Sequence, residues 1–146
     1  AAVKRGVTVK VIVAGISDIM LAKHAERYIY RWIFKKNIQL YEYPNTVLHA
    51  KLATCDYKFV TAGSYNVNNI SAYVSIEMNL DVENEAFARH ITTELEKIIA
   101  EDCTLITRED YNTKFNVIQY AWQYVCYEII RLVFFLFTFY FKQRKK

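Results

Sequence analysis

A chain of 146 residues gives at most one ordinary domain. Hydrophobic residues make up 53% of it and aromatic residues 16%, while Pro occurs once and Gly three times. This composition allows a large core and excludes a disordered linker or low-complexity protein. The net charge of +4 is too weak to favour a nucleic-acid-binding surface.

The cysteines and the start of the chain bear on its cellular setting. Cys55, Cys103 and Cys126 are widely spaced and form no Cys-x-x-Cys pair, which argues against a disulfide scaffold or a zinc site and fits a reducing compartment. The chain opens without Met, at AAVKRGV, a stretch typical of the end of a helix, and these first residues lack the n-region and h-region of a secretory leader. We expect a fragment of a longer protein.

The first third of the chain predicts a strand, a helix and a second strand. Residues 7–14 alternate β-branched Val and indicate a strand with one buried face. Residues 17–37 open with Ser17 as a cap and indicate a helix. Its core face is expected to consist of Leu21, Ala25, Tyr28 and Trp32. Residues 38–43 predict a strand stopped by Pro44.

The middle of the chain predicts three further strands and an amphipathic helix. Strands are expected over 48–55 and 57–63, joined by a turn at Asp56, and over 75–81. Residues 83–103 indicate a helix. Its core side is expected to consist of Phe87, Ile91, Leu95, Ile98 and Ile99. Strands and helices mixed in this way predict a layered α/β domain.

Two basic side chains stand two residues apart in the third strand. His49 and Lys51 point to one face of an extended segment, whereas Leu48, Ala50 and Leu52 point to the other. An imidazole can attack phosphorus or transfer a proton near neutral pH, and a fixed ammonium neutralises phosphate oxygens. An isolated pair of this kind is more often a surface His and Lys on a half-buried strand.

The pattern continues in a way that favours the chemical interpretation. Asp56 follows Lys51 after four residues, and GSYN begins six residues later with Gly63 and Ser64. Gly allows backbone to approach an oxyanion, Ser64 and Asn66 offer hydrogen-bond donors, and Glu77 is able to hold an imidazole in one tautomer. Coincidence explains the whole set poorly.

The constellation resembles the signature of the phospholipase D superfamily: His-x-Lys, four residues, Asp, six residues, Gly-Ser, then Asn and Glu. Residues 1–105 as a whole resemble bacterial cardiolipin synthases, in particular the B-type branch. The resemblance implies an α/β layered sandwich with helices on both sides of a mixed sheet, one lobe of which is incomplete at its N-terminus. Ile70-Ser71 and Ser75 depart from residues common in cardiolipin synthases and affect the expected substrate preference.

The resemblance implies a role for each residue of the constellation. His49 is a catalytic imidazole, Lys51 a catalytic group that also binds the substrate phosphate, and Glu77 the partner that orients a His. Ser64 and Asn66 bind phosphate, while Asp56 belongs to the signature in a mainly structural role.

The family needs two such motifs, and this sequence holds one. His24 and His90 lie on predicted helices without a Lys two residues later and are read as surface or core-edge residues. We therefore expect the first motif in a missing N-terminal half, in the same chain or in a second subunit. His49 is then the general acid and base of the second half.

The implied reaction transfers a phosphatidyl group through a phosphohistidine, turning phosphatidylglycerol into cardiolipin and glycerol without a metal or other cofactor. Implied partners are anionic phospholipid and the cytoplasmic side of a bacterial inner membrane, with no nucleic acid. A phosphodiesterase or nuclease of the same superfamily, or a lobe that is non-catalytic by itself, stay open as alternatives.

The C-terminal region, residues 106–146, is expected to form a membrane-associated helix outside the catalytic half-domain of residues 1–105. Residues 132–141 are apolar on all sides and are followed by basic residues, which suits an anionic membrane surface. Ten helical residues rise about 15 Å, half of a bilayer core. We favour a helix lying in the membrane interface with its end dipping into lipid. The alternatives are a helix that packs in the core or against another lobe, and a single membrane span. Glu128 and Arg131 disfavour the span because they would lie inside the bilayer.

Overall fold

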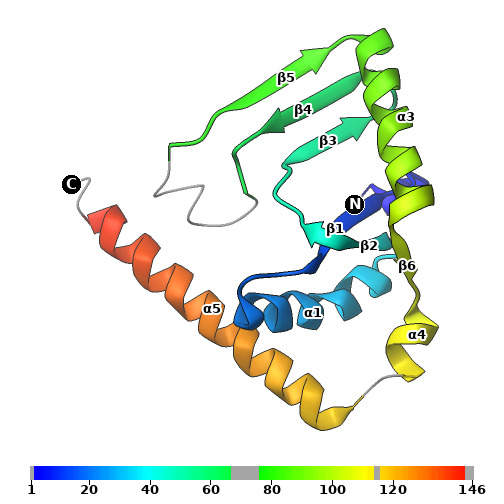
Figure 1. Cartoon of the computed structure of the whole chain (residues 1–146). Helices are drawn as coiled ribbons and strands as arrows, with labels where there is room; N and C mark the ends of the chain where they lie inside the picture. Colours follow the sequence, from blue (N-terminus) through cyan, green and yellow to red (C-terminus); the bar gives the residue numbers. More distant parts are fainter. Residues whose placement is uncertain (1, 67–75, 114–115, 144–146) are drawn as a thin grey trace. The chain divides into compact units, whose positions relative to one another are not determined.

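The structure is a computed structural model that describes residues 2–66, 76–113 and 116–143, with side chains described through residue 139. It divides into two compact units. Unit 1 comprises residues 1–48 and 99–130, and unit 2 comprises residues 49–98 and 131–146. Figure 1 shows the order of the elements along the chain.

Unit 1 is built around a three-stranded sheet with the order β1-β2-β6. Its elements are η1 (Val3–Arg5), β1 (Lys10–Ile16), α1 (Met20–Lys35), β2 (Gln39–Val47), β6 (Thr104–Ile106), α4 (Arg108–Thr113) and the first part of α5 (Val117–Gln143). β1 and β2 are parallel and linked by α1, whereas β6 pairs antiparallel with β2. Leu40 of β2 is 1% exposed and lies at the centre of this core.

β2 continues past the proline that was expected to end it. The register between β1 and β2 shifts between Ala14 and Ile16, so Ala14 pairs with Tyr43 but Ile16 pairs with Val47. Pro44 lies within this irregularity, where the missing N–H breaks no regular ladder. A Cβ built on Gly15 would lie 2.8 Å from the Cα of Pro44, so only Gly allows the two backbones to approach this closely.

α1 begins three residues later than expected. Its N-cap is Ile19, which makes no capping hydrogen bond, and the Ser17 hydroxyl instead accepts from the N–H of Ile19 in the preceding turn at 3.2 Å. The core-face prediction is correct for Ala25, which is buried, and wrong for Trp32, which is 55% exposed. The periodicity failed because polar side chains, described next, occupy the buried face.

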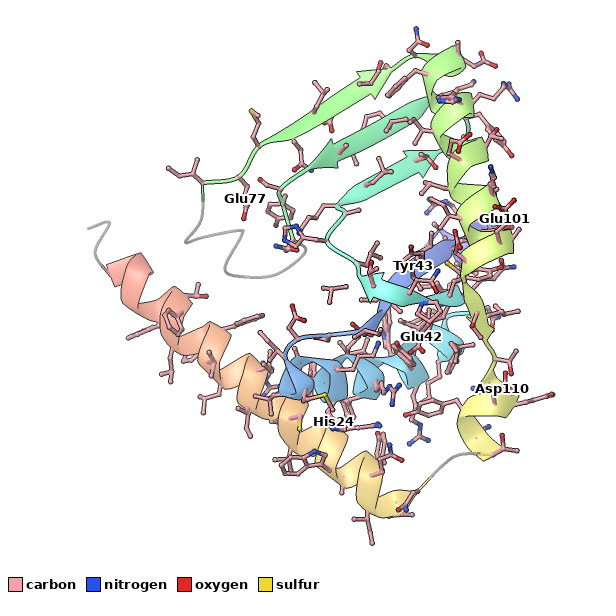
Figure 2. All side chains as sticks on the ribbon, in the orientation of Figure 1. His24, Glu42, Tyr43, Glu77, Glu101 and Asp110 are labelled. Carbon is pink, nitrogen blue, oxygen red and sulfur yellow. The ribbon has the colours of Figure 1, made fainter. Side chains whose placement is uncertain are left out.

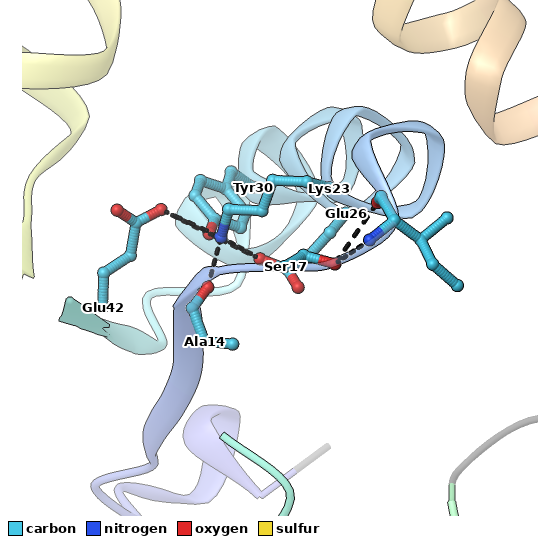
Figure 3. Close-up of polar contacts among 7 residues, drawn as sticks. Ala14, Ser17, Lys23, Glu26, Tyr30 and Glu42 are labelled. Carbon is cyan, nitrogen blue, oxygen red and sulfur yellow. Dashed lines mark hydrogen bonds and ion pairs between the residues drawn. The ribbon is translucent and has the colours of Figure 1, made fainter. Parts of the chain in front are cut away.

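A buried ion-pair network joins α1 to the sheet of unit 1 (Figure 3). The Lys23 ammonium donates to the Ala14 carbonyl and, at 2.8 Å, to Glu26; it lies 3.6 Å from Glu42 of β2. The Tyr30 hydroxyl lies 2.8 Å from Glu26 and 2.7 Å from Glu42, and its single proton serves one carboxylate at a time. Burial, the negative charge of Glu26 and the bond to Glu42 raise the pKa of Tyr30 well above its ordinary range. The phenol therefore stays neutral and able to donate.

Unit 2 contains an antiparallel sheet with the order β3-β4-β5. Its elements are β3 (Leu52–Cys55), β4 (Phe59–Gly63), β5 (Asn79–Glu83), most of α3 (Glu85–Asp102) and the end of α5. β3 begins at Leu52, where pairing with Ala62 starts, so His49 precedes the strand instead of lying in it as expected. β5 also starts later than predicted, at Asn79, and Ser75 lies outside the described residues.

α3 forms close to its predicted range, but its core face is less buried than its periodicity suggested. Ala88 is fully buried, whereas Phe87 is 42% exposed. Ile91, Leu95, Ile98 and Ile99 are half-buried. Asn84 accepts from the N–H of Phe87 at 2.9 Å and caps the helix.

The first half of α5 packs against α1. The Tyr28 ring of α1 lies 5.0 to 5.3 Å from the rings of Tyr120, Tyr124 and Tyr127, and His24 meets Trp122 edge-on at 6.4 Å. Gln123 and Cys126 are buried on this side. Within the described residues, Val117–Phe139 is one segment long and apolar enough to cross a membrane by length and composition, with a mean hydropathy of 1.3 and 11% of it buried.

The fold class is therefore confirmed as mixed α/β with a C-terminal apolar helix. The described strands form two three-stranded sheets, where one mixed sheet was expected. The short strand β6 and helix α4 between α3 and α5 were not predicted, because three and six residues are too few for a periodic pattern.

Candidate functional site

The ends of three strands meet at one end of the unit 2 sheet. Because neighbouring strands run antiparallel, the start of β3, the end of β4 and the start of β5 lie together: Leu52 pairs with Ala62, and Gly63 with Asn79. The expected site residues His49, Lys51, Ser64, Asn66 and Glu77 all flank this end. Sequence positions up to 28 residues apart are thus brought to one edge.

Asp56 lies at the other end of the same hairpin. It follows Cys55, whose partner is Phe59, in the turn between β3 and β4. Asp56 and Tyr57 have φ angles of 49° and 57°, the left-handed region that Asp tolerates better than most residues. Asp56 therefore shapes the turn, and the structure does not bring it to the other site residues.

His49 and Lys51 lie on the segment that leads into β3. The His49 side chain is exposed and Lys51 is half-buried. The Lys51 ammonium donates to the carbonyl of His49 at 3.0 Å, and the Lys51 carbonyl accepts from the N–H of Gly63 at 3.0 Å. These contacts fix the backbone of Lys51 to the end of β4 and hold its positive charge beside His49.

Ser64 joins the end of β4 to the start of β5. Its N–H donates to the Met78 carbonyl at 3.0 Å, and its hydroxyl oxygen accepts from the Met78 N–H at 3.0 Å. The hydroxyl proton faces the same carbonyl at 3.5 Å, a long and weak bond. Ser64 can donate to a phosphate oxygen by giving up this one weak contact, while its other two bonds still place Met78.

Glu77 and Asn66 complete the set. Glu77 is half-buried and directly precedes Met78, which Ser64 holds, so its backbone is placed at the same end of the sheet (Figure 2). Asn66 is exposed, three residues beyond the end of β4. The departures from the family pattern, Ile70-Ser71 and Ser75, lie outside the described residues.

Asn79 is a member of this edge that the sequence analysis missed. Its side-chain oxygen accepts from the N–H of Tyr65 at 3.2 Å, and its amide nitrogen lies 3.4 Å from the Thr61 hydroxyl. It stands two residues after Glu77, the spacing that places two side chains on one face of a strand. This two-residue spacing from Glu77 was the sequence signal that could have identified Asn79.

Gly63 is required where β4 meets β5. A Cβ added there would lie 2.3 Å from the carbonyl oxygen of Met78 and 2.3 Å from the side-chain oxygen of Asn79. The first clash involves backbone, so no side-chain rotation removes it. The site edge therefore depends on a residue without a side chain at position 63.

We expect Gly63→Ala to lower the free energy of unfolding by about 2 kcal/mol through this overpacking. Urea unfolding measures the loss. Gly63→Ala combined with Asn79→Ala removes only the side-chain clash and should regain less than half of the loss. A single variant within about 0.5 kcal/mol of the parent chain would contradict the close approach.

A cavity in the described part of the chain lies elsewhere. It occupies about 330 Å³ in unit 1, and its walls include Arg27, Tyr30, Glu42, Tyr111 and Gln123. None of the expected site residues lines it. The candidate site therefore stays at the strand ends of unit 2, where His49 and Lys51 lie.

Comparison with known proteins relates the chain to one family. The family described as "Cardiolipin synthase, PLD-like domain" matches residues 1–99. Cardiolipin synthase B of Salmonella typhi is 36% identical over 102 residues, 70% of this chain and 25% of the relative. Cardiolipin synthase B of Escherichia coli (strain K12) is 32% identical over the same shares. Cardiolipin synthase A of Buchnera aphidicola subsp. Schizaphis graminum is 22% identical over 77% of this chain and 23% of the relative.

No solved structure matches the chain significantly. The chain spans about a quarter of the length of the curated relatives that it matches. The family match covers more than half of the chain and includes His49, Lys51, Asp56, Ser64, Asn66 and Glu77. The chain belongs to the phospholipase D-like cardiolipin synthase family.

Proposed function

We propose that this chain supplies the second His-x-Lys motif of a phosphatidyltransferase that makes cardiolipin from phosphatidylglycerol. The observation that carries the proposal is the edge of the unit 2 sheet, where hydrogen bonds between backbone groups, and from the side chains of Lys51 and Ser64 to backbone groups, hold the segments of the site together. Family membership supports the same conclusion.

In the proposed reaction, a histidine of the first motif attacks phosphorus of phosphatidylglycerol. A P–N bond forms, the P–O bond to glycerol breaks, and His49 gives its proton to the departing alkoxide. A hydroxyl of a second phosphatidylglycerol then attacks the phosphorus: a new P–O bond forms, the P–N bond to the first-motif histidine breaks, and His49 takes the hydroxyl proton. Lys51, Ser64 and Asn66 bind the phosphate oxygens, and Glu77 orients an imidazole.

The partners follow from the substrate. The first motif comes from an N-terminal half, in the same chain or in a second subunit, so this chain alone is inactive. Both phospholipids stay in the bilayer, and we place the enzyme on the cytoplasmic face of the bacterial inner membrane. The apolar helix α5 and the basic residues that follow it support a membrane location.

The test is the product made by the intact gene product. Membranes from a host that makes no cardiolipin are supplied with phosphatidylglycerol, and lipids and glycerol are measured. Equal amounts of cardiolipin and glycerol are expected. Phosphatidic acid without cardiolipin would identify a hydrolase, and cleavage of DNA without any lipid product would identify a nuclease; either result overturns the proposal.

A further inference from the structure

α5 carries an apolar seam of exposed side chains along one helix face, with Trp122 at the edge of this face, where it meets His24 of α1. The seam residues are Ile118, Trp122, Val125, Ile129, Leu132 and Leu136, spaced alternately by four and three residues along one helix face. Their exposed fractions run from 39% at Ile129 to 81% at Ile118. Such a stripe normally faces a core, and here it faces outward.

Gln123 of α5 is covered by the rest of unit 1. It is 5% exposed and accepts from the Tyr111 hydroxyl of α4 at 3.5 Å. Arg31 of α1 lies over the Tyr120 ring at 4.8 Å. In the first half of α5, Gln123 is thus turned toward the protein, while the apolar side chains of the seam are exposed.

This arrangement conflicts with a helix that crosses the bilayer. Crossing from Val117 to Phe139 would strip α5 from α1 and place Gln123, Glu128 and Arg131 in hydrocarbon, which is costly. A helix that lies in the plane of the interface keeps its contacts with α1. It also directs the whole seam, about 27 Å from residue 118 to residue 136, into lipid.

The chemistry around the seam favours lipid over a second copy of the chain. A paired coiled coil would carry a series of complementary charges beside its seam, whereas here Glu128 stands beside the seam and Phe135 and Phe137 stand near its C-terminal end. Aromatic side chains of this kind are enriched at membrane interfaces. The residues that follow, Lys142, Arg144, Lys145 and Lys146, are four positive charges that suit anionic headgroups and would repel each other in a parallel pair.

We propose that the α5 seam is the membrane-binding surface, with the helix lying in the plane of an anionic bilayer, backed by α1. This does not rest on the proposed chemistry, because no site residue takes part. Trp122 reports on the seam, and Trp32 of α1 is its matched control, since the two are 52% and 55% exposed and are the only tryptophans.

The experiment uses the 146-residue chain and vesicles of phosphatidylglycerol with brominated acyl chains. With Trp32→Phe, the remaining Trp122 emission should fall about twofold on binding; with Trp122→Phe, the Trp32 emission should change by less than about a tenth. In a Trp-free background, Ile129→Trp should be quenched best by bromines near the headgroups. Best quenching by bromines at the chain ends would indicate a span and overturn the in-plane helix.

A charge in the seam provides an independent readout. Ile129→Asp should weaken binding to phosphatidylglycerol vesicles about tenfold, whereas Ile29→Asp, at an α1 residue that is also 39% exposed, should leave it within about twofold. Circular dichroism checks that both variants fold. The proposal would be overturned if Ile129→Asp and Ile29→Asp weakened vesicle binding equally, or if neither weakened it. It would also be overturned if sedimentation without lipid showed that the chain is a dimer and that Ile129→Asp makes it a monomer.

Discussion

Replacing His49 by Ala in the intact gene product is expected to lower cardiolipin formation about 10³-fold, because the departing glycerol alkoxide loses its proton donor. The imidazole is exposed, so its removal leaves no cavity, and the temperature of unfolding should stay the same. His90→Ala is the matched control: it removes an exposed imidazole of the same unit, on α3, and should retain full activity.

The assigned role of His49 can be separated from that of a nucleophile. A phosphatidyl ester of nitrophenol has a leaving group that needs no proton. If His49 is the general acid, His49→Ala should slow release of nitrophenol from this ester far less than release of glycerol. An equal loss with both substrates would contradict the acid role and assign His49 to attack on phosphorus.

Replacing Lys23 by Met is expected to lower the free energy of unfolding by about 3 kcal/mol, although the two side chains are similar in size. Lys23 is the one cation among the described residues placed between Glu26 and Glu42, and it is 7% exposed. Its loss leaves two neighbouring carboxylates without compensation and removes the bond to Ala14. Thermal or urea unfolding measures the effect.

Lys35→Met, an exposed residue in the last turn of the same helix, is the control and should change stability by less than about 0.5 kcal/mol. Adding Glu42→Gln to Lys23→Met removes one of the uncompensated charges and should regain part of the loss. A Lys23→Met chain as stable as the Lys35→Met chain would mean that the network contributes nothing to folding.

The fold was predictable where a pattern is long and local. α1 and α3 exceed fifteen residues and were found from periodicity, and the hairpin between β3 and β4 follows from the turn at Asp56. The continuation of β2 through Pro44 was not predictable, because it depends on a register shift against Gly15. The buried role of Lys23 was missed for a related reason. A Lys in a helix is ordinarily exposed, and Glu42 of β2, which pairs with Lys23, is 19 residues away in the sequence.

The site residues were identified from their spacing and from the resemblance, and the structure adds how their backbones are connected. The bonds between Lys51 and Gly63 and between Ser64 and Met78 depend on strand pairing, which no local pattern in the sequence gives. The roles of His49, Lys51, Ser64, Asn66 and Glu77 stay predictions. Only the structure shows that Ser64 also holds Met78, the residue before β5, by hydrogen bonds.

The position of Asp56 bears on how members of this family are found in genomes. Asp56 stands in the turn between two strands with a positive φ, away from the edge that carries His49. Asn and Gly adopt the same backbone conformation. A sequence search that requires Asp at this position selects for the conformation of the hairpin turn and not for reactivity. It will miss homologues in which Asn or Gly occupies the same turn.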